Sequence, residues 1–186
     1  MLVVGVLLWR AGFIQVTHAT GWPALLDVAV LVLSLDLLMY VFHRVAHHPL
    51  LYRWVHATHH IYDKPRLLTL FALNPIEALG FGCMLILVCL VYPVSALGLS
   101  IYLLLNVLFG LVGHIGVEPL PQQWLRLPVL RFISTSTFHA EHHHDGRHNF
   151  GFYTLLWDKV FGTAAPEYST DFGEAGQRTI QGHSPR

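Results

Sequence analysis

The chain has 186 residues, of which 54% are hydrophobic and 12% are charged, and its formal net charge is zero. The charge density is about half that of an average globular domain, so this composition indicates a membrane protein. A neutral charge balance gives no reason to expect a nucleic-acid partner, and two cysteines are too few for a disulfide-rich scaffold. The unusual count is that of histidine, with fourteen residues against eleven lysines and arginines together.

Four apolar segments are candidates for membrane-spanning helices, because about 20 apolar residues cross the hydrocarbon core of a bilayer. The first is short and contains Arg10, but it lacks the basic start and the clear cleavage site of a signal peptide, so we interpret it as a span. Tyr92 and Pro93 separate the third segment from the fourth and predict a tight hairpin there. The segments are 1–16, 24–42, 75–92 and 95–113.

These spans predict an all-α fold, a polytopic membrane bundle of about four helices with a cytosolic histidine-rich helical cap. Two hairpins return 43–74 and 114–186 to the same side, and every lysine and arginine except Arg10 lies in those two segments. The excess of positive charge makes that side cytoplasmic. We expect residues 1–166 to form the membrane domain and the polar segment 167–186 to be a mobile tail.

Eight histidines fall in clusters with helical spacing, and a ninth, His114, stands alone at the end of the predicted span 95–113. Offsets of three and four residues return to one helix face, so each cluster can direct two or three imidazoles at one point. Imidazoles beside a bilayer are costly to desolvate unless a partner satisfies them, and metal ligation does so. Nine ligands exceed the four of a structural zinc site, which favours two ions. The predicted metal ligands are His43, His47, His56, His59, His60, His114, His139, His142 and His143.

Ligand type alone leaves the metal open, because imidazole suits iron, zinc, copper and nickel. It also leaves the class of protein open. The alternative to an enzyme is a membrane protein that only binds or transports metal. Transport needs ionisable groups along a path near mid-bilayer, whereas these histidines gather outside the predicted spans. The sequence therefore favours an enzyme over a transporter.

The histidine motifs resemble those of the integral-membrane fatty acid hydroxylase and sterol desaturase superfamily. The resemblance extends from Asp36 to Thr163, about two thirds of the chain. It includes Asp36-x-x-x-Tyr40-x-x-His43-Arg44-x-x-His47, Leu51-Tyr52-x-x-x-x-His56-x-x-His59-His60, Asn74-Pro75-x-Glu77, His114, Ser136-Thr137-Phe138-His139-x-x-His142-His143, Asn149-Phe150-Gly151 and Trp157-Asp158-Lys159 with Phe161-Gly162-Thr163.

The resemblance implies an oxidoreductase that hydroxylates or desaturates a membrane lipid, such as a sterol or a fatty acyl chain. It implies two iron ions on the nine histidines, with zinc as a substitute in purified material, and the use of dioxygen. Electrons are expected from an external donor of the cytochrome b5 or ferredoxin type, because no cytochrome b5 domain is recognised in the sequence. Asp36 and Asp158 are candidates to orient an imidazole through its other ring nitrogen.

Two positions depart from patterns found among relatives. Asn74 stands where many relatives have a histidine, so we assign no ligand there, and Glu118 stands where the fatty acid 2-hydroxylases have a second histidine. Glu118 is therefore a candidate oxygen ligand. Lipid is expected to enter sideways from the bilayer into a slot between the helix ends, lined by Tyr40, Phe71, Leu73, Phe109 and Phe138.

Overall fold

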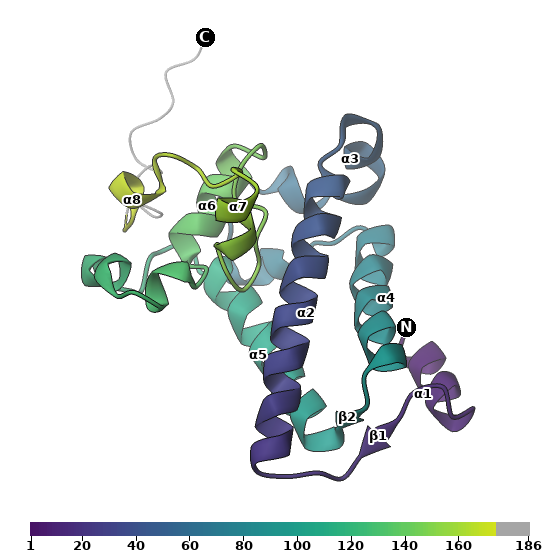
Figure 1. Cartoon of the computed structure of the whole chain (residues 1–186). Helices are drawn as coiled ribbons and strands as arrows, with labels where there is room; N and C mark the ends of the chain where they lie inside the picture. Colours follow the sequence, from purple (N-terminus) through teal and green to yellow (C-terminus); the bar gives the residue numbers. More distant parts are fainter. Residues whose placement is uncertain (174–186) are drawn as a thin grey trace.

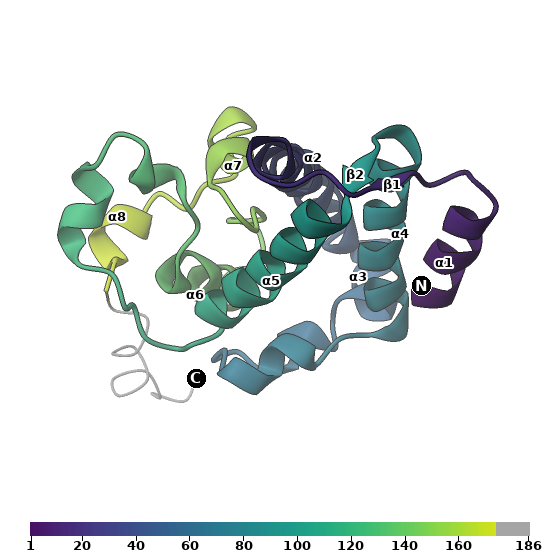
Figure 2. The same cartoon turned by 90° about the horizontal axis from the view of Figure 1, so that it is seen from below.

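A 25-residue helix, α2 (Trp22–Ala46), runs through the middle of the molecule (Figure 1). The structure, a computed structural model, describes residues 1–173. Helix α2 follows Gly21, whose φ of 63° lies in the left-handed region that glycine adopts at little cost, and Pro23 pre-sets the backbone of its first turn. It packs against both α4 (Pro75–Val91) and α5 (Ala96–Gly113). Figure 2 shows these helices from below.

The expected spans 24–42, 75–92 and 95–113 coincide with these three helices to within a few residues. Helices α2 and α5 are long and apolar enough to cross a membrane, and α4 is a slightly shorter apolar helix of 17 residues. Their starts follow from local sequence. The Asn74 side chain accepts a hydrogen bond from the Ile76 amide at the start of α4, and the Ser95 hydroxyl accepts one from the Gly98 amide at the start of α5.

The segment 1–16 differs from the expected span. Helix α1 (Leu2–Arg10) has nine residues and rises about 14 Å, less than half of the ~30 Å hydrocarbon core. The chain then turns at Gly12 and forms a two-residue strand, β1 (Val16–Thr17), which pairs in parallel with β2 (Val94–Ser95). This pair makes the fold mostly helical rather than all-α. Helix α1 is therefore too short to be the first of the four expected spans.

The turns at the β1–β2 end are tied to α2 through Asp27. One carboxylate oxygen of Asp27 accepts a hydrogen bond from the Tyr92 hydroxyl, and the other accepts one from the Ser95 amide, both at 2.8 Å. A Cβ at Gly98 would come within 2.7 Å of the Asp27 side chain, so glycine is required for this close approach. The hairpin between α4 and α5 is thereby fixed against α2.

The opposite end of the bundle carries short helices that form a cap. The last helix of this cap, α8 (Tyr168–Asp171), packs Tyr168 against Phe138 at a ring-centroid distance of 5.6 Å, and Phe172 is also buried there. The packed domain thus continues beyond the expected boundary at 166, whereas 174–186 lie outside the described residues. The cap elements are α3 (Pro49–Val55), η1 (His59–Ile61), η2 (Leu67–Phe71), η3 (Gln122–Arg126), η4 (Leu130–Phe132), α6 (Ser136–His144), α7 (Leu156–Val160) and α8 (Tyr168–Asp171).

Candidate metal centre

Helix ends bring distant histidines to the cap end of the bundle. His43 lies in the last turn of α2, His47 directly follows that helix, and His114 directly follows α5. The short segment after α2 contributes its histidines from the end of α3 and from η1. Helix α6 contributes three more, and its start is fixed by the Thr135 hydroxyl, which accepts a hydrogen bond from the Phe138 amide.

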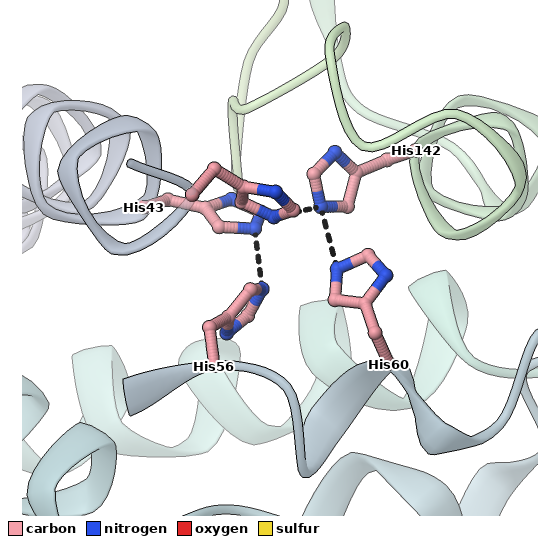
Figure 3. A group of neighbouring side chains, drawn as sticks. His43, His56, His60 and His142 are labelled. Atoms are coloured by element: carbon pink, nitrogen blue, oxygen red, sulfur yellow. Dashed lines mark hydrogen bonds between the residues drawn. The ribbon is translucent and has the colours of Figure 1, made fainter. Parts of the chain in front are cut away.

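All nine predicted histidines lie in two compact groups, within each of which the candidate ligand nitrogens are no more than 4.8 Å apart. In the group formed by His59, His114, His139 and His143, the four Nε2 atoms form a closed ring in which adjacent Nε2 atoms are 3.1 to 3.3 Å apart. Figure 3 shows members of the other group with their ring nitrogens turned toward one another. The five-histidine group is His43, His47, His56, His60 and His142; the four-histidine group is His59, His114, His139 and His143.

Two of the sequence clusters divide between the groups, although each was expected to serve one point. His59 and His60 are adjacent in the chain but belong to different groups, and the same is true of His142 and His143. On α6 the reason is geometrical, because successive helical side chains point about 100° apart whereas positions four apart share a face. Accordingly His139, four residues before His143, lies in the same group as that residue.

The hydrogen bonds of three rings determine which nitrogen is free to act as a ligand. The Nδ1–H groups of His43, His114 and His142 donate to backbone carbonyls at 2.7 to 2.9 Å. Since a carbonyl can only accept, Nδ1 carries the proton and the Nε2 lone pair of each ring points into its group. This is the arrangement that a metal-ligating imidazole requires.

Burial keeps these imidazoles neutral. It lowers the pKa of His60 to about 4. For His59, burial and then the proximity of His114 lower the pKa to about 2. On α6, burial followed by neighbouring imidazoles places the pKa of His142 well below its usual range. At neutral pH each ring is therefore uncharged, with a proton on one nitrogen and a lone pair on the other, the state that binds a metal ion.

Glu77 is a functional candidate that the sequence interpretation missed. Its side chain is 1% exposed, and its Oε1 lies 2.6 Å from Nδ1 of His56. Its carboxylate can therefore accept the Nδ1–H of His56, as backbone carbonyls accept the Nδ1–H of other rings. A signal was present in the sequence, because a carboxylate in the first turn of an otherwise apolar helix is costly unless it has a partner.

Asp36 does not contact an imidazole. Its carboxylate accepts hydrogen bonds from the Tyr153 and Thr154 amides and from the Thr154 hydroxyl, which joins α2 to the loop before α7. The expected orienting role is not found for this residue. It instead anchors a loop that packs against the bundle.

Asp158 acts one step away from the ligand set. It accepts hydrogen bonds from the Phe150 and Gly151 amides at 2.8 and 2.7 Å, and the Phe150 carbonyl in turn accepts the Nδ1–H of His43. A Cβ at Gly151 would lie within 2.8 Å of the Asp158 carboxylate, so the tight approach depends on glycine. Asp158 therefore positions His43 through the backbone rather than by direct contact.

Glu118 is not placed as an oxygen ligand. Its two oxygens accept hydrogen bonds from the Leu120 and Thr137 amides at 3.3 and 2.9 Å, so it caps the start of α6. Asn74 likewise caps α4. Of the remaining histidines, His48 caps α3 and His144 is exposed, whereas His183 lies outside the described residues.

A cavity of about 320 Å³ opens beneath both histidine groups. Its volume lies in the ~300–1,000 Å³ range of pockets for small molecules. His43 and His56 line it from one group, and His59, His114 and His139 from the other. Most of its remaining wall is apolar and comes from α2, α4, α5 and the 70–73 segment.

The expected slot is only partly right. Phe71 and Leu73 line the cavity, but Tyr40, Phe109 and Phe138 do not. Tyr40 instead stacks on Phe161 at a centroid distance of 5.4 Å. Phe138 is fully buried in the core of the cap. Tyr40, Phe109 and Phe138 belong to helices that reach the site, but their side chains contact other neighbours.

The sequence motifs and the convergence of the histidines agree with a comparison to protein families. The family model described as fatty acid hydroxylase matches residues 28–163, nearly three quarters of the chain. This chain belongs to the fatty acid hydroxylase family. The matched region contains both histidine groups as well as Glu77 and Asp158. No solved structure gives a significant match.

Three curated relatives have names that refer to the oxidation or desaturation of sterols or to the decarbonylation of very-long-chain aldehydes. "Lathosterol oxidase" of Mus musculus is 32% identical over 77% of this chain and 46% of the relative. "Delta(7)-sterol 5(6)-desaturase" of Leptosphaeria maculans is 26% identical over 76% of this chain and 38% of the relative. A "Very-long-chain aldehyde decarbonylase" of Oryza sativa subsp. indica is 29% identical over 84% and 24%, respectively. The chain thus spans less than half the length of these relatives.

Proposed function

We propose that this protein is a membrane oxidoreductase that uses dioxygen to hydroxylate or desaturate a lipid at two iron ions. The observation that carries the proposal is the convergence of nine imidazoles in two groups directly above an apolar cavity. Iron bound there supplies the redox chemistry needed to attack an unactivated C–H bond, which acid–base groups alone cannot do. All nine histidines are the proposed ligands, and zinc is a proposed substitute in purified protein.

The chain's own residues fit such a centre. Carbonyl acceptors hold three ring tautomers with Nε2 directed inward, and Glu77 is placed to hold a fourth ring, that of His56. Five of the nine rings are buried and the other four are partly buried, which limits the access of water and favours neutral rings. The apolar cavity beneath can hold a hydrocarbon segment next to both groups.

Lipid is the proposed substrate class, because the cavity is bounded by apolar side chains of bundle helices. The names of the relatives refer to sterols and to very-long-chain aldehydes, and a sterol or a fatty acyl chain is proposed here by analogy. We propose that the chain crosses the membrane more than once, with both histidine groups at the cytoplasmic face and electrons delivered by a cytochrome b5-type or ferredoxin-type donor. The distribution of lysine and arginine supports that orientation.

The decisive experiment compares the lipids of cells with and without the protein by mass spectrometry, together with metal analysis of the purified chain. We expect a lipid whose mass rises by 16 or falls by 2 mass units, and about two ions per chain, as two separate histidine groups require. Metal uptake into cells with no change in any lipid would instead identify a transport or metal-binding protein.

A further inference from the structure

One wall of the cavity carries polar groups that the metal centre does not use. Among the described residues that line it, the polar side chains are the histidines, Glu77, and two residues of α5, Tyr102 and Asn106. Asn106 precedes His114, the residue that directly follows α5, by eight positions, which corresponds to about 12 Å along the helix axis. A carboxamide at this depth of an apolar helix is costly unless it is hydrogen-bonded.

Asn106 is held from behind by Tyr153. The Tyr153 hydroxyl lies 2.6 Å from Oδ1 of Asn106 and 2.9 Å from the Tyr102 hydroxyl. Tyr153 is 1% exposed, its ring packs edge-on against Phe109, and its backbone amide is bound by Asp36. The position of this hydroxyl is therefore fixed, and so is that of the Asn106 carboxamide.

Counting hydrogens shows that a donor remains unused on the cavity side. Tyr153 has one hydroxyl hydrogen, so it donates either to Asn106 or to Tyr102. In the first case both N–H bonds of Asn106 stay free; in the second, with the amide turned over, one N–H bond is used and one remains. Either way Asn106 presents at least one N–H donor to the cavity that it lines.

The charge of the wall restricts what that donor can bind. Within the described residues no lysine or arginine lines the cavity, and its one carboxylate, Glu77, is engaged with His56. No cationic side chain in the described part of this wall neutralises a fatty acid carboxylate or a phosphate held at Asn106, about 12 Å along the helix from His114, so such a group would be desolvated there at high cost. An uncharged oxygen with a free lone pair matches an amide N–H donor.

We propose that Asn106 binds the hydroxyl or carbonyl oxygen of an uncharged lipid and so positions its hydrocarbon part beneath the histidine groups. This substrate class rests on the proposed function for the oxidation itself. It makes a neutral lipid alcohol, aldehyde or ketone the ligand, rather than a free fatty acid or a phospholipid. Asn106 then fixes which carbon lies next to the metal centre.

The test measures binding of tritiated lipids to the metal-loaded chain in detergent, without dioxygen or reductant. The probes are two pairs that differ in one hydroxyl, 1-hexadecanol with hexadecane and cholestan-3-ol with cholestane, together with hexadecanoate. We expect the alcohol of at least one pair to bind about three- to tenfold more tightly than its hydrocarbon, as one neutral hydrogen bond gives. We expect 1-hexadecanol to bind more tightly than hexadecanoate.

The variant Asn106→Leu should abolish the preference for the alcohol, and Leu104→Ala, which is on the same helix at an exposed position away from the cavity, should keep it. Equal binding of alcohol and hydrocarbon in both pairs, stronger binding of hexadecanoate, or a preference that survives Asn106→Leu would overturn the proposal. The wild-type comparison stands even if the variant does not fold. Because no turnover is needed, these results are independent of whether cells contain an oxidised lipid.

Discussion

Nε2 of His43 lies 2.9 Å from Nε2 of His56, while the other nitrogen of each ring already faces an oxygen acceptor. The acceptors are the Phe150 carbonyl at 2.9 Å and the Glu77 carboxylate at 2.6 Å. With Glu77 ionised, both Nδ1 atoms carry the protons and two lone pairs face each other across the short distance. In this protonation state a cation between the two nitrogens satisfies both lone pairs.

The Glu77 carboxylate is expected to strengthen metal binding through His56. Glu77→Leu should weaken metal affinity by about 10- to 100-fold, the usual effect of removing a partner that orients an imidazole ligand. Glu77→Gln keeps an oxygen acceptor at the same place and should lose less. Titration with a competing chelator measures both affinities. Equal affinities in the wild type and in Glu77→Leu would show that this carboxylate does not support a ligand.

Removing one histidine should empty only the group to which that histidine belongs. His59→Ala affects the four-histidine group and His142→Ala the five-histidine group, so each variant should retain about one ion per chain and lose lipid oxidation. The matched control is His144→Ala, an exposed histidine on the same helix as His142, which should keep both ions. Elemental analysis by mass spectrometry counts the metal. Full metal content in both test variants would remove these residues from the ligand set.

The metal-free protein should lose stability in acid. Burial lowers the pKa of His60 to about 4, and burial with the proximity of His114 lowers that of His59 to about 2, both from 6.5. Below about pH 6.5 the unfolded chain takes up protons that the folded chain does not. Each such ring therefore costs up to about 1.4 kcal/mol of unfolding free energy per pH unit as the pH falls from 6.5 toward 4.

Thermal unfolding of the metal-free protein between about pH 4.5 and 8 measures this dependence. Stability from these groups should be constant above pH 6.5, and His60→Gln should make the decline below it shallower. An equally steep decline in His60→Gln would contradict the assignment of the slope to this buried ring.

Asp36 and Asp158 should differ in their effects. Asp36→Ala leaves the Tyr153 and Thr154 donors without their acceptor and should cost about 3 kcal/mol of stability, with little change in metal per folded chain. Asp158→Ala removes the bonds that hold the Phe150 peptide, so His43 loses its support and metal affinity should fall as well. Melting temperature and metal content together separate the two. A normal metal affinity in Asp158→Ala would show that the Phe150 carbonyl is held by other contacts.

The sequence by itself determined the features that depend on local patterns. Apolar runs with Pro or Gly at their borders predicted α2, α4 and α5 within a few residues, because helix formation and helix ends are governed by neighbouring residues. Residue type and spacing also selected the nine histidines that the structure brings together. The family follows from the same motifs.

Tertiary structure decided which nitrogen faces which. The placement of His59 and His60 in different groups depends on the direction of their side chains. The contacts of Glu77 with His56 and of Asp36 with the loop before α7 join segments that are distant in the chain. The polar wall at Asn106 likewise exists only because a loop from the cap places Tyr153 against α5. Such contacts are set by how helices pack around a shared core, and periodicity along one helix carries no information about its neighbours.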